Sequence, residues 1–311
     1  MKLPARHVTA TVGARRWRLP VLPLVAGLIA WIGMGVILYP TVAAWFSQYN
    51  QSLLIENYSV DISRGTDPTA TELLREAREY NDALSSGALL GANERVPTGA
   101  GETTSGLEYR DMLRAGGIDV MARLKIPAID VDLPVYHGTD DATLLRGVGH
   151  LEGTSLPVGG ESTRSVLTAH RGLASATLFN DLDKVEVGDT FTIEVFGEVL
   201  TYRVFDTKVV EPDETEALRQ EAGRDLVTLV TCTPLGINSH RILVTGERIE
   251  PTPIADVEAA GTPPEIPGFP WWIVIIVGGT LAVIAYVWYS GYPSRRKAAP
   301  APAEGAGAAA D

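Results

Sequence analysis

Two long stretches without a charged side chain, one near each end of the chain, most restrict what this sequence can fold into. The first covers residues 19–46 and the second covers residues 266–294. Each exceeds the ~20 apolar residues that a membrane-spanning helix needs. Trp272 and Trp288 mark the two edges of the second apolar run, as aromatic belts do at membrane interfaces. We therefore predict transmembrane helices at 19–46 and 268–290.

The alternative for the first stretch is a secretory signal peptide, but its apolar part exceeds the ~7–15 residues of such a peptide. Basic side chains flank both stretches on their outer sides: Arg15, Arg16, Arg18, Arg295, Arg296 and Lys297. The positive-inside rule then predicts cytoplasmic tails at 1–18 and 291–311 in a cell-membrane protein. The segment from about Gln48 to Glu265 is expected outside the membrane. Its acidity, with a formal net charge of −12 for the whole chain, argues against nucleic acid as a partner.

An N-terminal extension at 47–118 precedes the main domain. Within it, apolar residues recur at helical spacing over Thr69–Leu84, directly after Asp67-Pro68, and predict an amphipathic helix. The stretch Ser85–Gly106 is rich in Gly, Ser and Thr and is interpreted as a flexible connection.

Short β-type runs broken by Gly, Pro, Asn or Asp fill the region 119–250. They are Ala122–Ile126, Val131–Tyr136, Ser165–Ala169, Thr190–Phe196, Leu200–Val210, Leu226–Thr231 and Arg241–Ile249. Many short strands at close spacing favour a sandwich or a closed barrel. A Pro-rich acidic linker at 251–267 leads to the second apolar stretch.

Cys232 is the only cysteine, so it cannot form a disulfide within the chain. A lone thiol is either a buried small apolar group or a reactive one. Cys232 follows a β-type run directly and shares a face with Val230 at the C-terminal edge of that strand. A thiol at a strand end can meet a substrate.

Arg241 begins the next β-type run. If the two strands pair antiparallel, Arg241 and Cys232 lie at the same end of the sheet, where the guanidinium favours the thiolate and can donate to an oxyanion. The alternative is a surface arginine in an ion pair. His170 ends another run and is the best candidate for proton exchange, because His137 and His150 lie in Gly-flanked loops and are interpreted as structural.

His240 would point away from Arg241, since neighbouring residues of a strand face opposite sides. With a single cysteine and no tight cluster of His, Cys, Asp and Glu, the sequence does not predict a metal site.

At these residues the sequence resembles the sortase family. Thr228-Leu229-Val230-Thr231-Cys232 matches the family's Thr-Leu-x-Thr-Cys signature, with Arg241 shortly after it, and Thr168-Ala169-His170-Arg171-Gly172 matches the histidine segment. The likeness covers roughly Val120–Arg248. It is closest to class C, the pilus-assembling group, which also has two spans.

The resemblance implies a mainly β fold, a closed eight-stranded sortase-type barrel with an N-terminal helical extension and two flanking transmembrane helices. It implies Cys232 as nucleophile, His170 as acid and base, and Arg241 as oxyanion stabiliser, with Thr231, Thr168 and Leu229 as supporting or substrate-binding residues. No cofactor is expected, because thiol acyl transfer needs none.

The resemblance also implies a substrate and its partners. A Leu-Pro-x-Thr-Gly-type sorting signal on a pilin or surface protein would be cleaved between Thr and Gly. The acyl group would pass to a pilin lysine or, alternatively, to a cell-wall precursor. A third hypothesis is a non-catalytic, membrane-tethered barrel that binds a partner. The sequence departs from the class C lid motif, Asp-Pro-aromatic, because its sole Asp-Pro is followed by Thr69; Tyr109 or Met112 is the other candidate plug.

Overall fold

The computed structural model describes residues 16–64, 68–84, 107–114 and 119–292. Their contacts divide the chain into two compact units, one from Met1–Leu38 with Trp271–Asp311 and one from Tyr39–Pro270. The long helix α1 (Val21–Arg64) contributes to both, and Pro40 lies inside it near the boundary. The connection predicted at Ser85–Gly106 lies outside the described residues.

The first unit consists of the N-terminal part of α1 and the helix α5 (Trp271–Ser290). Both helices are long and apolar enough to cross a membrane, as the sequence predicts. Trp31 Nε1 donates to Thr280 Oγ1 at 3.0 Å. A Cβ atom on Gly27 would lie 3.0 Å from Val283 Cγ1, so the glycine permits close packing of the two helices.

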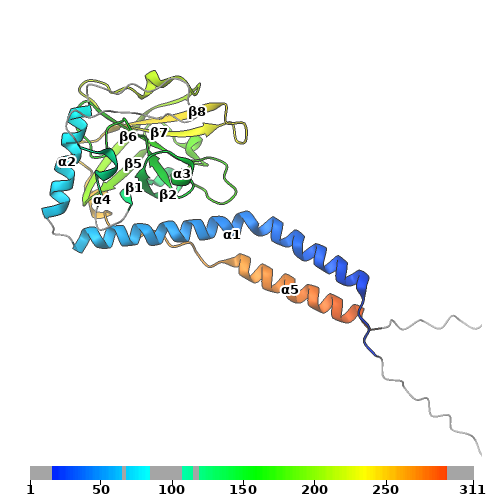
Figure 1. The fold of residues 1–311 in the computed structure, drawn as a ribbon. Coiled ribbons are helices and arrows are strands. Elements are labelled where there is room, and N and C mark those ends of the chain that lie inside the picture. The colour runs from blue at the N-terminus through cyan, green and yellow to red at the C-terminus, as the bar shows by residue number, and fades with distance from the viewer. Residues whose placement is uncertain (1–15, 65–67, 85–106, 115–118, 293–311) are drawn as a thin grey trace, which may run out of the picture. The chain divides into compact units, whose positions relative to one another are not determined.

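The second unit is built around eight strands that close into a barrel in the order β1-β2-β3-β4-β7-β8-β6-β5 (Figure 1). The strands are β1 (Val120–Ile126), β2 (Val131–His137), β3 (Val148–His150), β4 (Thr163–Thr168), β5 (Thr190–Val195), β6 (Glu198–Val210), β7 (Asp225–Thr233) and β8 (His240–Arg248). The β2–β3 and β4–β7 pairs are parallel and the others antiparallel. Closure leaves no free sheet edge, and the predicted closed eight-stranded barrel is confirmed.

Short helical turns precede the first strand or connect later ones. They are η1 (Tyr109–Asp111), η2 (Pro127–Ile129), α3 (Asp141–Leu144), η3 (Leu182–Lys184) and η4 (Thr215–Leu218). Of these, η3 follows the loop after β4, and η4 lies in the connection between β6 and β7. Both connections are adjacent in the chain to the strands that carry the candidate site.

The strand that the sequence does not predict is β3, which has only three residues. A Cβ on Gly149 would lie 2.3 Å from Gly138 O, so the close pairing of β3 with β2 requires a glycine there. His137 and His150, interpreted as loop residues, instead end β2 and β3. That interpretation of their location was wrong.

The barrel wall separates two apolar clusters, because successive residues of a strand face opposite sides. The main core includes Leu167 of β4, Leu229 of β7 and Val244 of β8. A smaller cluster on the opposite face, here called the outer cluster, comprises Leu151, Val166, Val210, Leu218, Val230 and Leu243. Leu218 comes from η4, so this connection covers the outer face of β4, β7 and β8.

The helical extension packs against the barrel. Tyr58 of α1 is fully enclosed, and its hydroxyl donates to Met121 O at 3.2 Å and accepts from Phe196 N at 3.1 Å. The helix α2 (Pro68–Leu84) confirms the predicted amphipathic helix. Asn81 of α2 accepts from Leu156 N at 2.7 Å and donates to Leu156 O at 3.1 Å, which fixes this helix to the chain between β3 and β4.

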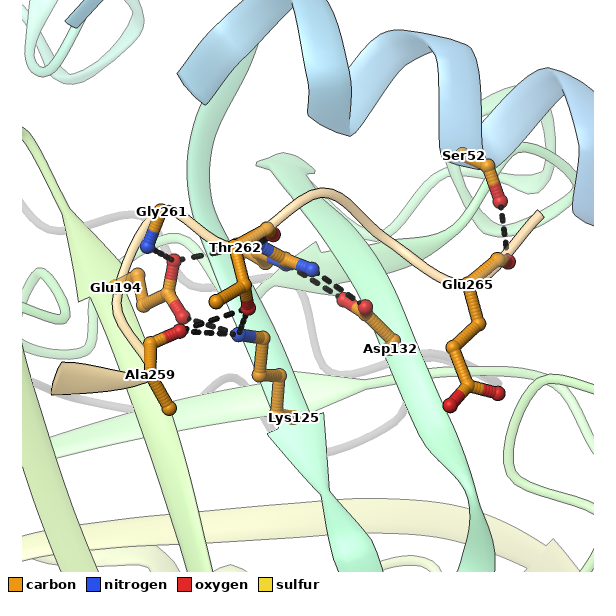
Figure 2. A network of polar contacts seen from close by, with 9 residues as sticks. Ser52, Lys125, Asp132, Glu194, Ala259, Gly261, Thr262 and Glu265 are labelled. Carbon is orange, nitrogen blue, oxygen red and sulfur yellow. Dashed lines mark hydrogen bonds and ion pairs between the residues drawn. The ribbon is translucent and has the colours of Figure 1, made fainter. Parts of the chain in front are cut away.

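The linker predicted at 251–267 is fastened to the barrel and includes the short helix α4 (Ile254–Glu258) (Figure 2). Thr262 O accepts from Arg123 Nη1 at 2.8 Å, and Gly261 N donates to Glu194 Oε2 at 3.2 Å. Arg123 is 1% exposed and forms a two-pronged pair with Asp132 at 2.7 and 2.6 Å. The segment is therefore part of the folded domain.

Candidate active site

Cys232 and Arg241 are direct partners across the antiparallel β7–β8 ladder, at the end of β7 and the start of β8. Directly opposite side chains in such a ladder lie on the same face, with Cβ atoms ~4.5–5.5 Å apart. Arg241 Nη1 donates to Asn238 O and to His240 O, both at 3.0 Å, so the β7–β8 loop holds the guanidinium. Both side chains are partly exposed, which leaves the thiol within reach of a substrate.

His170 lies two residues beyond β4. In the parallel β4–β7 ladder Thr168 pairs with Val230, and Ala169 N donates to Val230 O at 3.2 Å, which continues the contact towards the strand end. Thr168 therefore stands beside Val230, and His170 and Cys232 each follow two residues further along their own strand or loop. Histidine, cysteine and arginine come from three adjacent strand ends.

The side chains of Cys232 and Arg241 belong to the outer face of the barrel wall. Val230 and Leu243, two residues from Cys232 and Arg241 respectively, are both in the outer cluster. Val210 of β6, also in that cluster, is the ladder partner of Arg241. The thiol and the guanidinium thus adjoin a buried apolar cluster that η4 covers.

The main chain before His170 is tied to the strand of the nucleophile. Thr231 is 1% exposed, and its hydroxyl donates to Ala169 O at 2.7 Å. Together with the bond from Ala169 N to Val230 O, this fixes the residue preceding His170. Thr231 is a supporting residue through this hydrogen bond.

The other sequence-predicted residues fall on both faces. Thr168 is partly exposed on the face of Val230. Leu229 is fully buried in the main core, so it stabilises the barrel from inside. His240 pairs with Thr233 and faces the side opposite to Cys232, as strand alternation predicts. Its Nε2 lies 3.2 Å from Glu211 Oε1.

Both candidate plugs, Tyr109 and Met112, are buried in the main core. Tyr109 is 6% exposed, and its hydroxyl contacts His150 Nδ1 at 2.9 Å and accepts from Gly138 N at 3.0 Å. Met112 is buried in the same core, and its carbonyl lies 2.8 Å from His137 Nε2. His150 is the ladder partner of Leu167, a residue of the main core, so Tyr109 and Met112 pack with the interior of the barrel.

His150 is a structural histidine. Burial lowers its pKa to about 4, although a hydrogen bond with Ser155 O at 2.8 Å opposes the shift. Burial also lowers the pKa of His137. Both imidazoles are therefore neutral near pH 7, in line with the structural role expected for them. Among the described residues, no group of three or more His, Cys, Asp or Glu side chains could hold a metal ion.

Sequence reasoning missed Arg171, the residue that follows His170. Its side chain is 8% exposed and contacts Asp183, Asn180 O and Thr233. The sequence feature that could have indicated Arg171 is a basic residue directly after the histidine. The partners of Arg171 lie 9 to 62 residues away in the chain, so the sequence does not show them. Val210 beside Arg241 was likewise hidden, because the β6–β8 pairing joins residues far apart in the chain.

A closed eight-stranded barrel with cysteine, histidine and arginine at adjacent strand ends is the architecture of a thiol-dependent acyl-transfer enzyme class. The family model of the sortase domain matches residues 124–249. Among solved structures, the chain is similar to sortase C-1 of Actinomyces oris, with 47% identity over 58% of this chain and 98% of that chain and a TM-score of 0.51. Sortase C of Streptococcus pneumoniae is 40% identical over 64% of this chain and 98% of that chain, with a TM-score of 0.54.

Among curated relatives, sortase D of Bacillus subtilis strain 168 is 31% identical over 129 residues, which is 40% of this chain and 62% of the relative. The matches span about three-fifths of the length of the first such relatives, 62% and 60%. This chain belongs to the sortase family, a family of cysteine transpeptidases.

Proposed function

We propose that the protein is a membrane-anchored transpeptidase that cleaves a Leu-Pro-x-Thr-Gly-type sorting signal between Thr and Gly and transfers the acyl group to a lysine of a pilin. Cys232 is the nucleophile, His170 the proton carrier and Arg241 the oxyanion stabiliser. The observation that carries the proposal is the Cys232–Arg241 ladder pair, with His170 two residues beyond the end of the neighbouring strand β4.

In the first step, the Cys232 thiolate attacks the carbonyl carbon of the signal's Thr. The carbonyl oxygen gains negative charge, which Arg241 stabilises by hydrogen bonds in the region that its loop contacts already fix. The C–N bond then breaks, and the departing glycine amine takes a proton from the imidazolium of His170. The product is a thioester between Cys232 and the Thr carbonyl.

In the second step, the lysine amine of another pilin attacks the thioester carbon. His170, now neutral, accepts the proton that the amine loses, and the thiolate of Cys232 departs as the isopeptide bond forms. The cycle returns the histidine and the cysteine to their starting forms, with no oxidant or reductant consumed.

The choice of a pilin as the protein substrate is supported by one similar protein. The solved structure of S. pneumoniae sortase C is described in terms of pilin substrate specificity, and that protein is 40% identical to this chain. The alternative acceptor is the amine of a cell-wall precursor, which would give anchored monomers. The amine differs, but the thioester is common to both.

The membrane arrangement is part of the proposal. Two apolar helices, α1 and α5, act as spans, with both termini in the cytoplasm and the catalytic barrel outside. Basic residues at the outer ends of both apolar stretches support this orientation. The barrel at 119–250 and the linker at 251–267 then face the compartment in which surface proteins are assembled.

Incubation of the full chain, in detergent micelles, with a Leu-Pro-x-Thr-Gly peptide tests the reaction. We expect cleavage between Thr and Gly by the wild type and none by Cys232→Ala. Binding of the peptide without cleavage by either protein would support the third hypothesis, a non-catalytic binding barrel.

A second experiment distinguishes the acceptors. A pilin with its lysines intact and a matched pilin with those lysines changed to arginine are each incubated with the enzyme. A covalent ladder from the first alone supports pilin polymerisation. Transfer to a cell-wall precursor amine with no ladder would overturn the pilin assignment and leave the transpeptidase in place.

A further inference from the structure

Arg171 connects three separate segments around the candidate site through one guanidinium. Its Nε donates to Asn180 O at 2.9 Å, its Nη1 to Thr233 Oγ1 at 3.1 Å, and its Nη2 lies 2.6 Å from Asp183 Oδ2. The side chain is 8% exposed, whereas Asp183 is 47% exposed. A buried guanidinium with each nitrogen in use holds its surroundings in one geometry, since its donors form a rigid planar fork.

The contact with Thr233 lies behind the nucleophile. Thr233 follows Cys232 in β7, so its hydroxyl points to the face opposite to the thiol. Arg171 in turn follows His170. The hydrogen bond from Arg171 to Thr233 therefore joins the residue after the histidine to the residue after the cysteine.

The loop that starts at His170 is closed at its base. Phe179 N donates to His170 O at 3.2 Å, and Gly172 N donates to Asn180 Oδ1 at 2.6 Å. Gly172 has φ +82°, and a Cβ there would lie 2.8 Å from Leu235 Cδ2, so the turn needs glycine. Arg171 bonds to Asn180 at the same point and reaches η3 through Asp183.

We propose that Arg171, held by Asp183, is a positioning residue that fixes the distance between the His170 imidazole and the Cys232 thiol. This inference rests on the proposed function. Proton transfer requires heavy atoms within about 2.6–3.2 Å of each other, and a displacement of 1 Å costs on the order of 10²-fold in rate. A lysine offers one nitrogen and cannot contact the three acceptors together.

The variants are Arg171→Lys and Asp183→Asn, measured in the full chain in detergent micelles. Lys184→Gln is the matched control, because Lys184 lies in the same turn η3 and its ammonium pairs with the exposed Asp181 at 2.9 Å. We expect Arg171→Lys to lower kcat for peptide cleavage by about 10- to 100-fold. The KM should stay within about twofold, and Asp183→Asn should show a smaller loss in kcat.

A substrate-free readout separates this inference from the proposed function. The single cysteine makes alkylation by iodoacetamide specific for Cys232. The alkylation rate, measured at a series of pH values, reports the interaction of the thiol with a neighbouring imidazole. We expect His170→Ala to change the wild-type profile, and Arg171→Lys to give a profile close to that of His170→Ala. Arg241 remains in every variant, so its influence on the thiol is common to all.

A wild type that fails to cleave the peptide counts against the proposed function alone, since the alkylation profiles still decide the role of Arg171. The positioning role is overturned if Arg171→Lys keeps the wild-type alkylation profile. It is also overturned if kcat is unchanged, or if kcat falls only in proportion to the fraction of protein that has unfolded, as measured by circular dichroism. Equal losses in Lys184→Gln and Arg171→Lys would contradict it as well.

Discussion

Cys232 and Arg241 face each other as partners in the ladder between β7 and β8. The pairing is a consequence of strand register, which the buried side chains on both faces of these strands specify, because a shift by one residue would exchange the two faces. The barrel core therefore sets the backbone positions of Cys232 and Arg241, and the contacts of the β7–β8 loop then hold the guanidinium.

Replacing Arg241 should impair the chemical step. We expect Arg241→Ala to lower kcat by about 10²- to 10³-fold, because the developing oxyanion loses its charged donor. Arg241→Lys should recover part of that loss, since a lysine keeps the charge but not the planar fork. Steady-state kinetics of peptide cleavage measures both. Unchanged cleavage in Arg241→Ala would rule out the assigned role.

Thr231 offers a test of how the histidine is supported. Thr231→Val keeps the shape of the side chain but removes the hydrogen bond to Ala169 O, which leaves a buried carbonyl without this donor. We expect the free energy of unfolding to fall by about 1–2 kcal/mol and kcat to fall by roughly tenfold. Thr231→Ser retains the hydroxyl and serves as the control. Equal behaviour of the two variants in denaturant titrations and kinetics would contradict this account.

Much of the barrel could be predicted from the sequence, because most strands have the alternating apolar pattern that one buried face imposes. The strand β3 could not, since three residues including Gly149 carry too little pattern. The strand-end location of Cys232, His170 and Arg241 was also predictable. Cys232 and His170 each follow an apolar run and Arg241 begins one, and the points where such runs start and stop in the sequence indicate the strand ends.

The contacts that support these residues were not predictable, because they join segments far apart in the chain. Arg171 meets Thr233, 62 residues further along the chain, only because β4 and β7 pair. The linker was expected to be a tether from its prolines and acidic residues, yet Thr262 meets the buried Arg123. Composition reports the average character of a segment, whereas a single hydrogen bond decides whether it is docked.

The buried Arg123 should contribute strongly to stability. Its guanidinium bonds to Asp132 and to Thr262 O and lies 3.4 Å from Glu194. Arg123→Ala leaves Asp132 and Thr262 O without this buried donor, so we expect the free energy of unfolding to fall by about 3 kcal/mol. Denaturant titration of the full chain in micelles measures it. The control is Arg219→Ala, because Arg219 forms an exposed pair with Glu216 and should change stability little. Similar losses in both variants would contradict the role of the buried network.

Acid should destabilise the fold through His150. Its pKa is about 4 in the folded protein because of burial, against an ordinary value near 6.5. Between these two pKa values the unfolded chain binds a proton at His150 that the folded chain does not. The contribution of neutral His150 to the free energy of unfolding is therefore fully present above pH 6.5 and is lost as the pH falls towards 4. The free energy of unfolding should drop by about 2 kcal/mol between pH 7 and pH 5 from this group. In His150→Gln that part of the pH dependence should disappear, and an unchanged slope would show that the effect lies elsewhere.

The most direct test of the account is to look for the covalent intermediate. The full chain in micelles is incubated with a Leu-Pro-x-Thr-Gly peptide without an acceptor amine, quenched in acid, digested and analysed by mass spectrometry. We predict that the peptide fragment containing Cys232 carries the mass of the Leu-Pro-x-Thr acyl group, that hydroxylamine removes it, and that Cys232→Ala shows none. Peptide cleavage at an undiminished rate in Cys232→Ala, or an acyl group on any other residue, would contradict the account.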